Sequence, residues 1–335
     1  MITPQAPIQQ PGNFQMQHVQ RISDSALESL WQRNDGEGAL VKKIVLNHLI
    51  NQSLQELEAK HVLAGVQILD LHNNKLLVQH DAATKHFAAS INKLPIALLI
   101  LQDLREGTLT MNQTITWQAS DVRAGYGVLD QPGAPLQASL KEVIFDLLNR
   151  SGNTATRILV NQGMGGAAAV NDRWAQISQL SNTRLQPLDA NRFYLGNSTP
   201  ADAMWALTML MKNQDAPAIF MKNAMQTNIF TDMGTRSQLS GGDYVVLVNK
   251  IGILDDVDGN NRHDVGIIYN LKTKKSYGYS FFTTSPYDDP EATPAADQAL
   301  KDMGRYTLRY AGDKKKSNQQ VRMQQTIPTE KRTLY

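Results

Sequence analysis

The chain has 335 residues, of which 41% are apolar and 19% charged, and this composition is that of an ordinary globular protein. Its formal net charge of +2 gives no reason to expect nucleic acid as a partner. Because cysteine is absent, a disulfide framework, a zinc–thiolate site and a cysteine nucleophile are excluded. No apolar run approaches the ~18 residues that a membrane span requires, so we expect none.

The two ends of the chain are polar. Residues 1–22 are rich in Gln and Pro without apolar periodicity, which predicts a disordered tether, and residues 313–335 form a basic tail of the same kind. The first residues lack the basic and apolar regions of a signal peptide. The chain is therefore either cytosolic or has lost an export segment, and the motifs described below favour an extracytoplasmic protein.

Between these ends, residues 23–312 are expected to form one domain. An amphipathic helix over 39–60 precedes two strand-like runs, VLAGVQILDL and KLLVQHD, which flank a turn at 72–74 and predict a hairpin. Helical patterns fill the middle of the chain, at 94–104, 136–150, 155–162 and 200–212. Strands return at 244–248, 265–270 and 277–283, and the last helix is expected over 294–310.

Strands at both ends with helices between them predict an α+β fold. The N- and C-terminal segments would pair in one antiparallel sheet with flanking helices, and the middle, about 84–235, would form an all-helical lobe inserted into it. A cleft where the two parts meet is the expected ligand site.

The segment FAASINKLPIALLILQDL places Ser90 and Lys93 three residues apart, at the start of a helix that is apolar on every side and therefore buried. Pro95 is tolerated only near a helix start, which places the N-terminus at about Ser90. A serine becomes nucleophilic when a base takes its proton, and a lysine is that base if burial or a second cation lowers its pKa. Taken alone, the segment is better explained by an ordinary N-cap serine beside a surface lysine.

Two further segments carry polar residues in places where a cleft is expected. In LLNRSGNTATRILVNQG, Ser151 and Asn153 lie in a turn between helices. Ser151 would relay a proton and Asn153 would bind a substrate amide or brace Lys93, or else these residues cap the next helix. In DYVVLVNKIGIL, Lys250 ends a core strand just before Gly252, which permits close approach of a ligand or another chain. Lys250 is thus either a second cation near Lys93 or a lysine that reaches solvent.

In this order, the serine–lysine pair, the serine–asparagine turn and the lysine–glycine strand resemble the class A β-lactamases and penicillin-binding proteins. The segments GYGVLDQPGAPL, TRLQPLD, GNSTPADAM and HDVGIIY extend the resemblance over about 40–310. The resemblance implies a β-lactamase/transpeptidase-like serine hydrolase that acts on a small-molecule β-lactam or a cell-wall peptide, with neither cofactor nor metal. It says nothing of the oligomeric state.

The resemblance also assigns roles. Ser90 would be the nucleophile, Lys93 its base and Ser151 the proton relay, while Lys250 would attract a substrate carboxylate and Asn153 would bind the substrate amide.

The remaining assignments concern the rim of the site. The backbone N–H groups of Ser90 and of Ile253, which follows Gly252, would form the oxyanion hole. Independently of the resemblance, Tyr126 is a candidate for an aromatic wall at the rim of the cleft. Arg236 either contacts the substrate carboxylate or is an ordinary surface arginine.

Three departures from the family pattern alter the expected activity. Gly152 stands where β-lactamases usually have aspartate, and the resulting serine–glycine–asparagine motif is more similar to that of D,D-peptidases. Ile251 replaces a threonine whose hydroxyl would bind the substrate carboxylate. The loop over 183–200 contains no glutamate. Its only carboxylate, Asp189, is either a base for deacylation or, as Asp commonly does, orders the loop by hydrogen bonds to nearby backbone. We therefore expect acylation with slow deacylation, and the alternative is a non-catalytic or penicillin-binding scaffold that retains the fold.

Overall fold

The computed structural model describes residues 29–30, 38–188, 193–239, 244–256 and 259–312. It divides into two units, Met1–Val45 and Leu46–Tyr335. In the first unit the described residues, 29–30 and 38–45, are helical. The predicted tether and basic tail lie outside the described residues.

The helices and strands follow one another as the sequence patterns predict, with additions in the middle of the chain. The helices are α2 (Gly38–Glu58), α3 (Lys93–Glu106), α4 (Leu140–Asn149), α5 (Asn153–Ile158), α6 (Gly166–Ala175), α7 (Pro200–Lys212), α8 (Ala216–Gln226) and α9 (Ala292–Ala311). The strands are β1 (Leu63–Asp70), β2 (Lys75–His80), β3 (His86–Phe87), β4 (Thr114–Thr116), β5 (Gln137–Ser139), β6 (Arg184–Pro187), β7 (Phe193–Ser198), β8 (Tyr244–Asp256), β9 (Gly259–Asn270) and β10 (Ser276–Ser285). None of these helices combines the length and the apolar character needed to cross a membrane.

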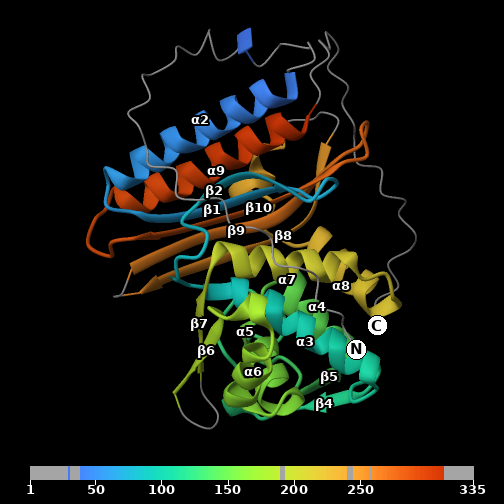
Figure 1. The fold of residues 1–335 in the computed structure, drawn as a ribbon. Helices are drawn as coiled ribbons and strands as arrows, with labels where there is room; N and C mark the ends of the chain where they lie inside the picture. The colour runs from blue at the N-terminus through green and yellow to red at the C-terminus, as the bar shows by residue number, and fades with distance from the viewer. Residues whose placement is uncertain (1–28, 31–37, 189–192, 240–243, 257–258, 313–335) are drawn as a thin grey trace. The chain divides into compact units, whose positions relative to one another are not determined.

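The main sheet is antiparallel, with strand order β2–β1–β10–β9–β8. The first and last thirds of the chain meet where β1 pairs with β10, with Val66 opposite Phe281. β10 is buried along most of its length because α9 packs on one face of the sheet and α7 on the other (Figure 1). The predicted α+β fold, with one antiparallel sheet built from both ends of the chain, is confirmed.

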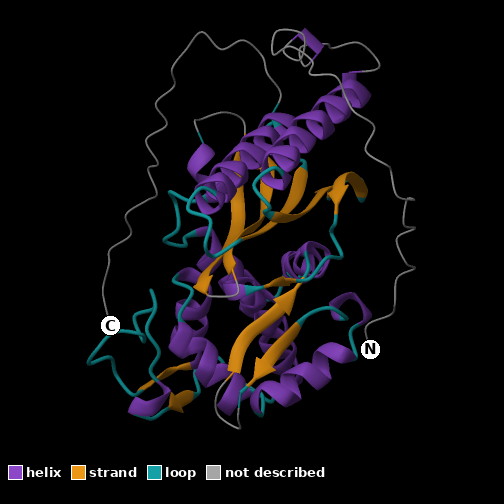
Figure 2. Cartoon of the chain, turned by 90° about the vertical axis from the view of Figure 1, so that its left-hand side faces the viewer, coloured by secondary structure: helices purple, strands orange, loops and turns teal. Residues whose placement is uncertain are grey.

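The segment between β2 and β8 is mainly helical and is organised around α3. The side chains of α3 are buried almost all round because α4, α7 and α8 pack against it. The segment is not purely helical as predicted: it also contains two small sheets, β3–β7–β6 and β4–β5 (Figure 2). Its boundaries at about 84 and 235 stay a prediction.

The contact that positions the site is the crossing of β8 over a short 3₁₀ turn, η1 (Ala89–Asn92), which precedes α3. A Cβ at Gly252 of β8 would lie 2.9 Å from Ile91 Cγ1 and 3.1 Å from the backbone oxygen of Ala88. Only glycine therefore allows the strand to lie this close to the turn that carries Ser90.

We expect Gly252→Ala to lower the free energy of unfolding by about 1–3 kcal/mol, because the added methyl group overpacks the contact with η1. Chemical denaturation measures the change. The matched control is Gly163→Ala, since a Cβ at that position would have nothing within 4 Å and should be neutral or slightly stabilising. Equal stability of the two variants would contradict the proposed contact.

Candidate active site

The turn that carries Ser90 is held in an unusual backbone conformation. Ser90 lies in η1, one turn before α3, rather than on the helix itself as the position of Pro95 predicted. Ala89 has a φ of 45°, in the left-handed region that costs a non-glycine residue roughly 1–2 kcal/mol. Asn92 holds the turn in place: its Nδ2 atom donates to the backbone oxygens of Arg184, Leu195 and Asn197 in the β6–β7 hairpin.

Two buried lysines converge on one serine hydroxyl. Lys93 Nζ lies 3.1 Å from Ser151 Oγ and also donates to the backbone oxygen of Ser151 at 2.5 Å and to Asn153 Oδ1 at 2.9 Å. Lys250 Nζ approaches the same Oγ at 2.9 Å and donates to the backbone oxygen of Ile251 at 2.8 Å. Lys93, Ser151, Asn153 and Lys250, which lie far apart in the sequence, therefore form one connected hydrogen-bonded cluster.

Burial weakens the affinity of both amines for a proton. It lowers the pKa of Lys93 to about 7, while the carboxylates of Asp130 and Asp146 partly offset the effect. Burial also lowers the pKa of Lys250 well below its usual value, and the neighbouring charge of Lys93 lowers it further. Near neutral pH the two amines therefore hold fewer than two protons, so one of them is available as a base.

Two carboxylates that were not predicted order the loop around Ser151. Asp130 accepts hydrogen bonds from the backbone N–H groups of Gly127, Asn153 and Thr154, at 2.9, 3.1 and 2.8 Å. Asp146, on α4, accepts one from Val128 at 2.7 Å. Both are buried. Together they join the loop before α4 to the turn that holds Ser151.

The structure gives a physical reason for Gly152. A Cβ at this position would lie 2.3 Å from Asp146 Oδ2, and the backbone N–H of Gly152 donates to the backbone oxygen of Asp146. The carboxylate of Asp146, on α4, therefore occupies the space that an aspartate side chain at position 152 would need.

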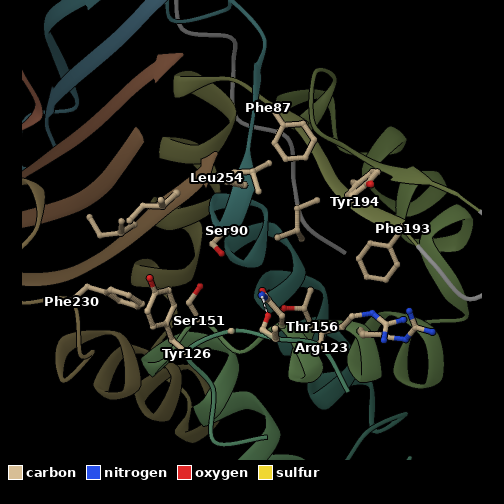
Figure 3. Close-up of a pocket in the computed structure, with 18 of the residues that line it drawn as sticks. Phe87, Ser90, Arg123, Tyr126, Ser151, Thr156, Phe193, Tyr194, Phe230 and Leu254 are labelled. Atoms are coloured by element: carbon tan, nitrogen blue, oxygen red, sulfur yellow. Dashed lines mark hydrogen bonds between the residues drawn. The ribbon is translucent and has the colours of Figure 1, made fainter. Parts of the chain in front are cut away.

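Beside the cluster lies a cavity of about 410 Å³. In Figure 3 the side chains of Ser90 and Ser151 point toward the same space. The lining residues are Phe87, Ala89, Ser90, Arg123, Ala124, Gly125, Tyr126, Ser151, Asn153, Thr156, Arg157, Leu188, Phe193, Tyr194, Leu195, Phe230, Ile251, Ile253 and Leu254. Lys93 and Lys250 are fully buried behind this lining.

Eight of the ten predicted site residues lie at or beside the cavity. Ser90, Ser151, Asn153, Tyr126 and Ile253 line the cavity, and Lys93 and Lys250 reach it through Ser151, while Gly252 packs on η1.

Arg236 and Asp189 do not join the cluster. Arg236, in the turn η5 (Gly234–Gln238), donates to the backbone oxygen of Gln226 at 2.6 Å and to Asn228 Oδ1 at 3.2 Å, and it does not line the cavity. The predicted contact of Arg236 with a substrate carboxylate therefore lacks geometric support. Asp189 lies outside the described residues.

Sequence reasoning missed the aromatic residues of the cavity other than Tyr126. Phe230 stacks edge-on against Tyr126, with ring centroids 5.4 Å apart, and its own centroid lies 5.7 Å from Lys250 Nζ. Across the cavity, Phe87 and Tyr194 form a second edge-on pair at 6.4 Å, and Phe193 lies nearby (Figure 3). The only indication of these residues in the sequence was the pair of aromatic residues that begins the run FYLGNS.

Comparisons with known proteins point to one family. A sequence model described as the β-lactamase enzyme family matches residues 49–310. The similar solved structures include a β-lactamase from Chitinophaga pinensis DSM 2588, with 17% identity over 79% of this chain and 100% of the other and a TM-score of 0.68. No match is found among curated proteins.

Of two other similar structures, one is described as a β-lactamase and the other as an acyl-enzyme complex. A β-lactamase from Sphaerobacter thermophilus DSM 20745 has 21% identity over 79% of this chain and 97% of the other, with a TM-score of 0.64. A mutant of PBP-A, described as an acyl-enzyme complex with penicillin G, has 18% identity over 78% of this chain and 95% of the other, with a TM-score of 0.65. At these identities the likeness concerns the fold.

We expect Gly152→Asp to destabilise the protein by about 2–4 kcal/mol, because the new side chain collides with Asp146 and adds a third carboxylate. In an Asp146→Ala background the same change should cost at least about 1 kcal/mol less, since the colliding group is gone. Denaturant unfolding of the four proteins in this double-mutant cycle measures the coupling. Strictly additive effects would show that Asp146 does not occupy this place.

Proposed function

Since the chain belongs to the β-lactamase enzyme family, we propose that it is a serine acyl-enzyme, with Ser90 as nucleophile, that reacts with β-lactams or peptidoglycan-type amides and releases the acyl group slowly. The observation that carries the proposal is the hydroxyl of Ser151, which lies within hydrogen-bond distance of two buried amines beside the cavity that Ser90 lines.

In acylation, Ser90 Oγ attacks the carbonyl carbon while neutral Lys93 takes its proton. The backbone N–H groups of Ser90 and Ile253 would stabilise the negative oxygen of the tetrahedral intermediate. When the carbonyl–nitrogen bond breaks, the proton returns from Lys93 through Ser151 Oγ to the leaving nitrogen. Lys250 polarises this hydroxyl from 2.9 Å and holds it in position for the transfer.

The burial of both lysines favours catalysis over a scaffold role. An amine removed from water loses several kcal/mol of hydration unless its charge is compensated. A binding scaffold gains nothing from keeping two such amines next to one serine. For a catalyst, the same burial produces the neutral lysine that proton transfer requires.

The composition of the cavity supports slow deacylation. None of the described residues that line it is Asp or Glu. The β6–β7 hairpin contributes Leu188, Phe193, Tyr194 and Leu195, all without a carboxylate that would activate water. Activation of water would then depend on Lys93 or on Asp189, and the latter remains a prediction.

The substrate class draws support from one structural relative, which is described as an acyl-enzyme complex with penicillin G. We extend this reactivity toward β-lactams to the present chain as part of the proposal. An extracytoplasmic location, where cell-wall peptides occur, belongs to the same proposal.

A fluorescent penicillin should label the protein covalently, and the label should persist after denaturation. Mass spectrometry should place the adduct on the peptide that contains Ser90, and Ser90→Ala should remove it. After excess reagent is removed, the acyl-enzyme should decay over many minutes rather than seconds, because an effective base for water is missing. Rapid turnover would show that such a base exists, and an unlabelled protein would favour the scaffold alternative.

The rate of acylation should depend on pH through Lys93. Its pKa is about 7, far below the usual value for lysine, so the neutral, basic form becomes the major one as the pH rises through 7. The second-order rate constant for adduct formation should therefore rise across about pH 6 to 8 and then level off. A rate that begins to increase only above about pH 9 would indicate an ordinary lysine.

A further inference from the structure

We propose that the preferred acyl donors carry a neutral, apolar group on the leaving side of the scissile bond, where substrates of related enzymes carry a carboxylate. The inference rests on the proposed acyl-enzyme function and specifies its substrate class. It comes from the side chains that surround Lys250 and from the two aromatic groups that flank Ser90.

The ammonium group best placed to meet a carboxylate is already engaged. Lys250 is only 2% exposed, and its Nζ atom donates to Ser151 Oγ and to the backbone oxygen of Ile251. The ring of Phe230 lies 5.7 Å from the same nitrogen, and Tyr126 packs edge-on against that ring. The amine of Lys250 is therefore bordered by an aromatic ring as well as held by two hydrogen bonds.

The strand beside Lys250 offers no side-chain donor in its place. Ile251, Ile253 and Leu254 of β8 all line the cavity, and none of them carries a hydroxyl. A carboxylate here would lose hydration without gaining a hydrogen bond from any side chain of this strand, which is unfavourable. An apolar group would instead be favoured, because it removes hydrocarbon surface from water.

The other cations of the cavity are far from this end and are already paired. In Figure 3, Arg123 lies beyond Thr156, on the opposite side of Ser90 and Ser151 from Phe230. Its guanidinium donates to the backbone oxygens of Ser120 and Val122. Arg157 is paired with Asp121, with Nε and Oδ1 3.1 Å apart. Arg157 is therefore neutralised by an ion pair, and backbone oxygens hold Arg123 on the side of the cavity away from Phe230.

The acyl side of the substrate would also meet apolar groups. The rings of Phe87, Phe193 and Tyr194 lie on the far side of Ser90 from Phe230 (Figure 3), and Leu188 and Leu195 complete this part of the lining. The two aromatic groups thus flank the nucleophile. The chemistry of the cavity fits an ester or amide that is apolar on both sides of its carbonyl.

With an aryl ester, the reaction uses the steps already described. Ser90 Oγ forms a bond to the carbonyl carbon, the carbonyl–oxygen bond to the aryl group breaks, and the proton of Ser90 reaches the departing phenoxide through Lys93 and Ser151. Water then adds to the Ser90 ester, which releases a carboxylic acid and restores the serine. No other reactant is required.

Two pairs of compounds that differ in one charge test the inference. The first pair is benzylpenicillin and benzylpenicillin methyl ester. The second pair consists of two aryl esters of phenylacetylglycine, in which the leaving phenol is either 3-hydroxybenzoic acid or methyl 3-hydroxybenzoate. Mass spectrometry follows the rate of adduct formation at Ser90, and for the aryl esters the release of the phenol is also followed. For each pair, the rate with the neutral compound divided by the rate with the acid gives one ratio. In the native protein this ratio should be one or greater for both pairs.

Ile251→Thr restores a hydroxyl next to Lys250 and should shift the ratio toward the acids by about tenfold or more, the effect expected for one hydrogen bond to a charged group. The matched control is Ile219→Thr, because Ile219 is 44% exposed on α8 and does not line the cavity. This control should leave the ratio unchanged, and thermal unfolding should show that both variants are folded.

The outcomes separate the two proposals. Native protein that reacts more than about tenfold faster with the acids would overturn the inference and leave the acyl-enzyme function intact. An Ile251→Thr variant with an unchanged ratio would also count against it. Absence of an adduct with all four compounds would instead contradict the acyl-enzyme function, and with it the inference.

Discussion

The site depends on the burial of two lysine amines around a single hydroxyl. Removing Lys93 and Lys250 from water costs more than their few hydrogen bonds return, so the rest of the fold has to hold them there. α3 carries one lysine and β8 the other, and the turn with Ser151 lies between them. The sheet and the helical part of the chain are thereby joined at the point where the chemistry is proposed.

The electrostatic compensation comes from residues outside the three motifs. Asp130 and Asp146 supply negative charge near Lys93, and they also accept the backbone N–H groups of the loop. The same two carboxylates thus order the loop and limit how far burial lowers the pKa of Lys93. Glycine at position 152 is part of this arrangement, because a larger residue would displace Asp146.

The sequence predicted the fold and most of the cluster because both depend on strong local patterns. α7 begins where Pro200 follows the N-cap Thr199, and the three motifs placed Ser90, Ser151 and Lys250. The rest depends on distant contacts. The predicted strand over 244–248 was too short, because the polar residues after Val248 obscured the continuation of β8, which is buried by elements distant in sequence such as η1 and α8. Phe230 follows a helix in a segment without periodicity, so nothing local indicated that it covers Lys250.

The left-handed backbone at Ala89 and Ser151 has an evolutionary consequence. Glycine would adopt these φ values of 45° and 59° at little cost, so a glycine at either position would relieve strain. At position 151 that exchange would remove the relay hydroxyl, and at position 89 it would loosen the segment that aims the nucleophile. Selection for a more robust fold and selection for reactivity would therefore act in opposite directions at these two residues.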